Sequence, residues 1–157
     1  MPDALRFLEW IKGRRGGRGP GRWVRAGLLC AWKAGRRLPG AQRLTVRVCA
    51  GGLRLKVRCF SYDDLLVISP HYEECIAREL PPPGTAAVDA GAFIGLYALR
   101  YAAAVGPEGR VVAIEPHARN FRLLEENVRL SGFQNVACVR CALGRAPGEA
   151  WLCLLYT

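Results

Sequence analysis

The sequence feature that most constrains the fold is a glycine-broken turn between a strand and a helix. Residues 86–88 form a short apolar strand pattern, and the acidic Asp89 follows it directly. Gly91 and Gly95 then stand four positions apart, ahead of an alanine-rich helix predicted over 93–104. Glycines at such a turn let the backbone approach a ligand, and a helix N-terminus presents amide groups to it. The stretch predicts a nucleotide-binding βα unit.

A second carboxylate follows at the expected distance. Residues 110–115 read as another buried strand, which ends in Glu115. In a βαβ unit, the end of the second strand lies beside the first turn, so Glu115 is placed to accept hydrogen bonds from ribose hydroxyls. A helix pattern over 118–131 and a strand pattern over 136–141 continue the alternation. We expect a right-handed, mostly parallel, doubly wound α/β sheet.

Three interpretations of the turn are open. The dinucleotide fingerprint Gly-x-Gly-x-x-Gly has only its first glycine here, because Phe93 and Leu96 occupy the positions of the second and third. An Asp-x-Gly-x-x-x-Gly spacing, starting at Asp89, fits S-adenosylmethionine, which has no pyrophosphate and so demands less glycine where the helix begins. An ordinary βαβ turn without a ligand is the third interpretation.

The run Val-Asp-Ala-Gly-Ala-Phe-Ile-Gly-Leu-Tyr at 88–97 resembles the first motif of the FkbM-type methyltransferases. The resemblance extends from about residue 53 to the C-terminus and is strongest over 88–144, including Glu115-Pro116 and Asn120-Phe121. Phe93 departs from it, because the family usually carries asparagine there. The resemblance implies a Rossmann-like class I fold, S-adenosylmethionine as cofactor, and methyl transfer to a hydroxyl of a sugar, glycan or natural product.

The same resemblance implies a set of cofactor-binding residues. Asp89 would face the cationic methionyl end, Pro116 would lie against the adenine, and Ala142 would close the adenine pocket. No catalytic residue can be assigned. The full expected cofactor set is Asp89, Gly91, Ala92, Phe93, Gly95, Glu115, Pro116 and Ala142.

Charge separates the N-terminal quarter from the rest. Residues 1–43 contain eleven Lys and Arg against two acidic residues, with a Gly/Arg run at 13–22 between two helix patterns. We interpret 1–43 as a basic helical extension with a linker. Residues 6–43 are either a phosphate-binding surface for RNA or an anionic membrane, or a solvated arginine-rich extension. The methyltransferase domain is assigned to 44–157, with its cofactor-binding part at 85–144.

A β-hairpin is predicted over 44–60, where two alternating runs meet at Gly51-Gly52. Its valines and leucines share one face, and the basic residues from Arg47 to Arg58 line a face that we expect to be solvated. Residues 62–69 suggest a further short strand, and 70–80 a helix with proline in its first turn.

Seven cysteines without a secretory signal favour reduced thiols and a cytoplasmic location. Cys138 and Cys141 have the CxxC spacing, but they lie in a predicted strand, where positions three apart face opposite sides. We therefore expect no metal site. The uncharged run at 26–32 is too short for a membrane span, which needs about 20 residues.

The sequence ends where a strand pattern at 151–156 begins. A complete enzyme of this type has further strands, which carry the substrate pocket. We therefore expect a fragment, completed by a C-terminal half or by a second copy that covers the sheet edge. Alternatives are an inactive cofactor-binding remnant, a basic nucleic-acid or anionic-surface module, and half of an NAD-dependent dehydrogenase.

Overall fold

The structure, a computed structural model, describes residues 34–35, 37–50, 52–68 and 80–152. Its central element is a parallel sheet of strands β3 (Ala86–Ala90), β4 (Arg110–Ile114) and β5 (Val136–Val139), in the order β3-β4-β5. Ala86 pairs with Arg110, and Val111 pairs with Val136. The three carboxyl ends therefore lie at one edge of the sheet, as the sequence predicts.

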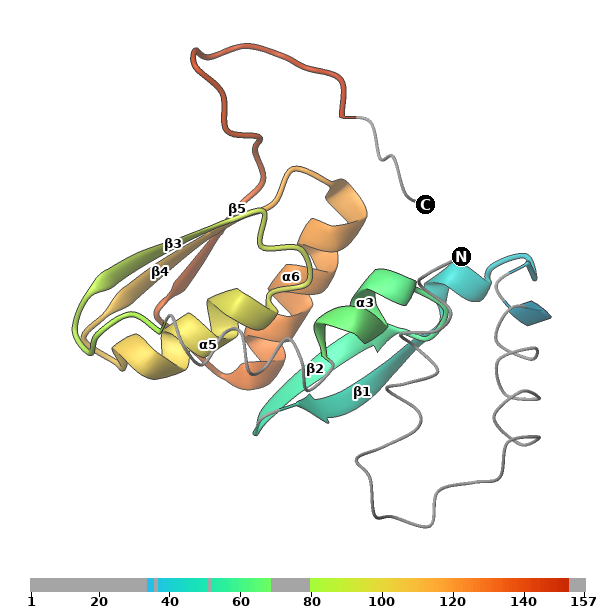
Figure 1. Cartoon of the computed structure of the whole chain (residues 1–157), viewed down its shortest axis with the longest axis horizontal. Helices are drawn as coiled ribbons and strands as arrows, with labels where there is room; N and C mark the ends of the chain where they lie inside the picture. Colours follow the sequence, from blue (N-terminus) through green and yellow to red (C-terminus); the bar gives the residue numbers. More distant parts are fainter. Residues whose placement is uncertain (1–33, 36, 51, 69–79, 153–157) are drawn as a thin grey trace.

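Two helices, α5 (Leu96–Val105) and α6 (Ala118–Ser131), cover the same face of this sheet (Figure 1). Small and β-branched residues of the strands, among them Val111 and Ala113, face the helices in one apolar cluster. The opposite face is more open, because Val88 is 61% exposed and Val139 is 40% exposed. These elements are a βαβαβ unit, and the α/β fold class predicted from the sequence is confirmed.

A hairpin of β1 (Thr45–Ala50) and β2 (Leu53–Arg58) lies on the far side of α6 from the sheet (Figure 1). Two adjacent leucines of α6 serve the two layers. Leu123 joins the apolar cluster of the hairpin residues Leu55 and Val57, whereas Leu124 joins the cluster beneath the sheet. The chain thus has three layers: sheet, helices and hairpin.

The hairpin is confirmed, but its basic side is not the fully solvated face that the sequence predicts. Lys56 Nζ lies 2.7 Å from Glu126 Oε2, and the Arg58 side chain pairs with the fully buried Asp64. Arg47 and Arg54 are exposed, as expected. Half of this basic row is therefore structural.

Residues 62–69, predicted as a strand, instead contain the helix α3 (Tyr62–Val67). The prediction rested on an apolar run and was wrong because it overlooked a helix start. The Ser61 hydroxyl accepts a hydrogen bond from Asp64 N at 3.2 Å and donates one to Asp64 Oδ1 at 2.7 Å. The bond from the Asp64 amide to the Ser61 hydroxyl is an N-cap bond, which fixes a helix N-terminus.

Two predicted boundaries also move. Helix α5 begins at Leu96 rather than at residue 93, because Phe93 and Gly95 both adopt positive φ angles that a right-handed helix does not admit. Strand β5 ends at Val139, two residues earlier than predicted.

Several predictions fall outside the described residues: most of the basic extension, the helix at 70–80 and the last strand beyond Leu152. Two residues of the N-terminal quarter are nevertheless packed, since Ala41 is 3% exposed and Gly35 lies against the Phe60 ring. Among the helices that the structure describes, none has the length and apolarity to cross a bilayer.

Candidate functional site

The turn after β3 is tied to β4 through its backbone. The amides of Gly91 and Ala92 both donate to the Ile114 carbonyl, at 2.8 and 2.9 Å. The amide of Gly95 donates to the Ala92 carbonyl at 2.8 Å, which closes the turn just before α5. Because these donors are used within the fold, they are not available to cradle a phosphate.

The two glycines of the turn have different surroundings. Gly91 has a φ of +85° and is exposed, and a Cβ there would meet no atom within 4 Å. Gly95 is buried, and a Cβ there would lie 2.7 Å from Leu124 Cδ1 of α6. Gly91 therefore leaves room on the solvent side of the turn, whereas Gly95 lets α6 approach the start of α5.

Phe93 lies between them with a φ of +53°, and it is the only non-glycine residue with positive φ in the described ranges. A bulky side chain is disfavoured in this left-handed region, where asparagine and glycine are common. Its amide donates to Glu115 Oε2 at 3.0 Å. The conformation of Phe93 therefore brings the turn into direct contact with the carboxylate that follows β4.

Glu115 is buried, with 6% of its surface exposed, and accepts three hydrogen bonds. Besides the Phe93 amide, the His117 amide donates to Oε1 at 2.9 Å and Asn120 Nδ2 donates to Oε1 at a long 3.4 Å. A carboxylate offers about four acceptor positions. Within the described part of the chain, one acceptor position on Oε2 therefore remains, and the weak Asn120 bond is the easiest of the three to replace.

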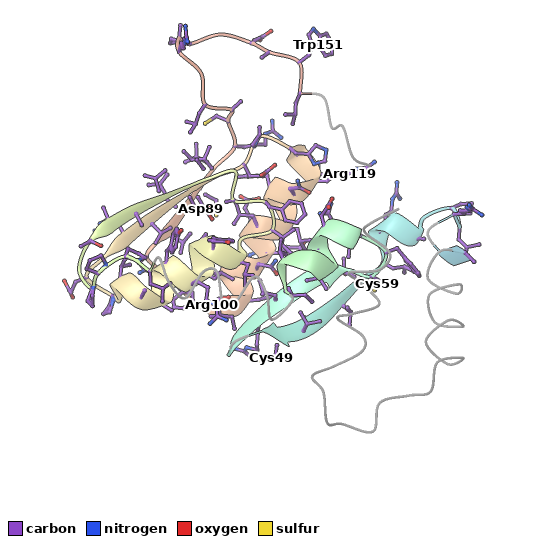
Figure 2. The ribbon with its side chains drawn as sticks, in the orientation of Figure 1. Cys49, Cys59, Asp89, Arg100, Arg119 and Trp151 are labelled. Carbon is purple, nitrogen blue, oxygen red and sulfur yellow. The ribbon has the colours of Figure 1, made fainter. Side chains whose placement is uncertain are left out.

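Asp89 lies at the end of β3, between the sheet and α5 (Figure 2). Desolvation by burial raises its pKa from 3.8 to about 6; a hydrogen bond from the Ala98 backbone opposes this rise, and the nearby Glu115 carboxylate adds to it. Its Oδ2 atom is buried and has no hydrogen-bond partner among the described residues. A buried unpartnered oxygen of this kind is costly to the fold and is suited to a cationic or hydrogen-bonding ligand.

The other predicted site residues are less closely assembled. Pro116 is half-buried next to Glu115, while Ala142 is exposed and lies three residues beyond the end of β5. His117, which the sequence suggested to be a surface residue, precedes α6 as its N-cap, but its Nδ1 atom is buried and has no partner. The structure thus brings the turn, Asp89 and Glu115 together and leaves Ala142 apart.

Two asparagines were missed as structural residues of the site, although both appear in the sequence as polar positions on the inner face of a helix. Asn120 supports Glu115, as described above. Asn127 is fully buried: its Nδ2 donates to the Ile94 carbonyl at 2.8 Å and to the Lys56 carbonyl at 3.1 Å, and its Oδ1 accepts from the Lys56 amide at 2.6 Å. Their i, i+7 spacing, which places both on one helix face, was the signal that could have identified them.

The described residues contain no group of three His, Cys, Asp or Glu side chains that could hold a metal ion. The site instead offers two carboxylates on either side of an open glycine. An unpartnered Asp89 oxygen and a remaining acceptor position on Glu115 fit a ligand with a cationic group and a hydroxyl group. These acceptors match S-adenosylmethionine, whose methionyl end carries an ammonium group and whose ribose carries hydroxyls.

No protein-family model matches the chain, and no curated protein matches it either. Solved structures do. TYW2 from M. jannaschii, in complex with AdoMet, superposes with a TM-score of 0.50 at 24% identity, covering 61% of this chain and 42% of that chain. TYW2 from P. horikoshii, in complex with MeSAdo, superposes with a TM-score of 0.49 at 22% identity, covering 67% of this chain and 39% of that chain.

A SAM-dependent methyltransferase from Aquifex aeolicus gives a TM-score of 0.42 at 24% identity, covering 48% of this chain and 40% of that chain. The chain therefore spans 42% or less of the length of each of these three proteins. At such identities the likeness establishes the fold alone. The fold is the Rossmann-like α/β fold of S-adenosylmethionine-dependent methyltransferases.

Proposed function

We propose that the chain carries the cofactor-binding part of an S-adenosylmethionine-dependent methyltransferase of FkbM type. The observation that carries this proposal is the pair of acidic side chains around Gly91, one with an unpartnered buried oxygen and the other with an acceptor position to spare. The acceptor is a hydroxyl of a sugar, a glycan or a natural product, as the sequence resemblance implies. The odd number of cysteines, seven, favours reduced thiols and a cytoplasmic setting.

The backbone of the turn argues against a dinucleotide. NAD binding uses amides at the glycine turn and the helix N-terminus to hold a pyrophosphate. Here the amides of Gly91, Ala92, Phe93 and Gly95 are all bonded within the protein. S-adenosylmethionine has no pyrophosphate, so the loss of these donors does not count against it.

Each carboxylate has its own part in binding. Asp89, ionised, receives the ammonium group of the methionyl end, directly or through water. Glu115 accepts one ribose hydroxyl at its remaining Oε2 position, and the second hydroxyl replaces the long bond from Asn120. Ordered groups of this kind hold the ligand in one orientation, which is most of what an in-line transfer requires of a protein.

The cofactor would supply an electrophilic methyl group on sulfonium. The chain's own residues bind and orient it, with Pro116 against the adenine and Gly91 leaving the approach open. Nothing in the reaction requires a covalent enzyme intermediate. The acceptor-binding residues are not assigned.

Calorimetric titration tests the proposal directly. Purified protein should bind S-adenosylhomocysteine, and bind it more tightly than NAD. Incubation with radiolabelled S-adenosylmethionine and a set of sugar, glycan and RNA acceptors then tests the acceptor class. Tighter binding of NAD, or no binding of either ligand, would overturn the proposed function.

Glu115→Gln is the sharper variant for the ribose contact. Glutamine keeps the volume but has a single acceptor oxygen, so it cannot serve the Phe93 amide, the His117 amide and a hydroxyl together. We expect S-adenosylhomocysteine affinity to fall by about tenfold or more, since one such bond is worth about 1–3 kcal/mol. Glu126→Gln is the matched control, because the Glu126 side chain bonds to Lys56 on the hairpin and lies outside the site. Equal affinities for the two variants would place the ribose elsewhere.

A further inference from the structure

Phe93 has a backbone conformation that its own side chain disfavours. With a φ of +53°, it lies in the left-handed region, where a bulky residue persists only if its surroundings hold it there. The Phe93 amide is nevertheless the donor that links the turn to Glu115. Something outside the turn must therefore offset the strain at this position.

The structure shows what holds the ring. The guanidinium carbon of Arg58, on β2, lies 5.4 Å from the centroid of the Phe93 ring, which is within cation–π range. The ring is half-buried and also packs on the apolar cluster shared by the hairpin, α5 and α6. The Phe93 side chain is thus one contact between the hairpin layer and the cofactor turn.

Arg58 is itself fixed. Its Nε donates to Asp64 Oδ2 at 2.9 Å and its Nη2 donates to Asp64 Oδ1 at 2.5 Å, in a bidentate pair. Asp64 is fully buried and is held in turn by the Ser61 hydroxyl and the Arg58 amide. The bidentate pair therefore holds the guanidinium over the Phe93 ring in one position, and a lysine ammonium could not make this pair.

We propose that Arg58 is a positioning residue for the cofactor site: the β1–β2–α3 unit holds Phe93 in its left-handed conformation and thereby keeps the Phe93 amide on Glu115. This inference rests on the proposed function for its ligand, but the mechanical link between Arg58 and the turn does not depend on the ligand's identity. A residue that adopts left-handed φ by itself, such as asparagine, would not require Arg58.

Two substitutions in combination test this link. Arg58→Lys keeps a positive charge beside Asp64 but removes the guanidinium over the Phe93 ring and its bidentate pair with Asp64. Phe93→Asn removes both the ring and the need to hold it. We expect Arg58→Lys to weaken S-adenosylhomocysteine binding about tenfold in the native background and less than twofold when Phe93→Asn is also present.

Lys56→Gln is the matched control, because Lys56 is on the same strand and its side chain is also ion-paired, but with Glu126 rather than next to the turn. It should leave affinity unchanged in both backgrounds. Equal losses from Arg58→Lys in the two backgrounds would mean that Arg58 only stabilises the fold, and would overturn the proposal.

Amide hydrogen exchange gives a readout that needs no ligand. Arg58→Lys should reduce the protection of the Phe93 amide, and Phe93→Asn should restore protection of the same amide in the double variant. Unchanged protection in Arg58→Lys would contradict the proposal even if the protein binds S-adenosylhomocysteine. Failure of the native protein to bind that ligand would instead overturn the proposed function, while the exchange data would still decide the role of Arg58.

Discussion

At the scale of single residues, Asp89 and Glu115 differ in how far the fold uses their oxygens. Glu115 accepts three hydrogen bonds within the protein, whereas Asp89 has a buried oxygen with none. Removing Glu115 therefore disturbs the fold and the site together. Asp89 is different, because the fold gains little from its charge.

Asp89→Asn should make the protein more stable at neutral pH. Because the folded-state pKa of Asp89, about 6, lies above its ordinary value, the native state binds the proton more tightly than the unfolded chain does. The stability that the protonated Asp89 contributes to the folded state is thus fully present below pH 4, and it is lost as the pH rises through 6. Urea unfolding should show the variant gaining up to about 3 kcal/mol over the native protein at pH 7 to 8, and nothing near pH 4.

An exposed carboxylate provides the comparison for this experiment. Glu149→Gln, in the exposed segment after β5, should follow the native protein across the whole pH range. A gain from Asp89→Asn that does not vary with pH would show that burial of the charge is not its cause. A ligand with an ammonium group should also release a proton from Asp89 on binding near pH 6, which calorimetry in buffers of different ionisation enthalpy detects.

At the scale of elements, the contact between β2 and α6 depends on Asn127. One edge of β2 pairs with β1. The amide and the carbonyl of Lys56 point to the other edge, where the Asn127 side chain bonds to both groups. Ser131 Oγ lies at a marginal 3.5 Å from the Arg54 carbonyl farther along this edge. Side chains of α6 therefore satisfy backbone hydrogen-bonding groups of β2 that a neighbouring strand would otherwise satisfy.

Asn127→Leu should loosen the hairpin from α6. Leucine has a similar size but leaves the Lys56 amide, the Lys56 carbonyl and the Ile94 carbonyl without their partner, and each unsatisfied buried group costs about 1–3 kcal/mol. We expect a loss of about 2 kcal/mol or more in urea unfolding. Glu126→Gln, one position earlier on α6, removes a half-exposed ion pair with Lys56 and should cost less than about 1 kcal/mol. Similar losses for both variants would refute the role of Asn127.

The regular elements were the predictable part of this molecule. The hairpin and the βαβαβ order follow from alternating or helical apolar patterns, and helix α6 was bounded correctly because Gly132 ends it with a left-handed φ. The short α3 was not recognised, since its apolar run outweighed the N-cap signal of Ser61. Tertiary bonds such as that of Asn127 to Lys56 join residues 71 apart in the sequence, and no local pattern encodes them.

The same limit applies to the site. The positions of Asp89 and Glu115 could be predicted, because the ends of neighbouring parallel strands meet at one edge. The contact of Arg58 with the Phe93 ring could not be predicted, because it depends on how the hairpin packs against the turn. The only sign of strain at Phe93 in the sequence was that phenylalanine stands where the resemblance to the FkbM-type methyltransferases implies asparagine.

At the scale of the whole molecule, we predict that residues 1–33 are dispensable for the fold and the site. A chain that starts at Ala34 keeps Gly35 against Phe60 and the buried Ala41. We expect it to retain its circular dichroism and its S-adenosylhomocysteine affinity, and to lose any salt-sensitive binding to RNA or anionic vesicles, because most of the excess positive charge is removed. Unfolding of the shortened chain would show that residues 1–33 belong to the core.

The outer face of the sheet sets the solution behaviour of this chain. Val88 and Val139 are partly exposed there, and β3 and β5 are both edge strands within the described sheet. Exposed apolar sheet surface binds the dye ANS and promotes association. The double variant Val88→Thr/Val139→Thr should bind less ANS and remain monodisperse at higher concentration in light scattering. Leu44→Thr, an exposed leucine just before β1, is the control and should change neither property.

The bond between Lys56 and Asn127 also has a consequence during protein synthesis. The hairpin leaves the ribosome 71 residues ahead of the asparagine that closes the outer edge of β2. At about 5–20 residues per second, Asn127 is synthesised roughly 4 to 14 seconds after Lys56, and the outer edge of β2 is unpaired during that time. The translation rate across 57–127 therefore sets how long a nascent strand edge is exposed to neighbouring chains.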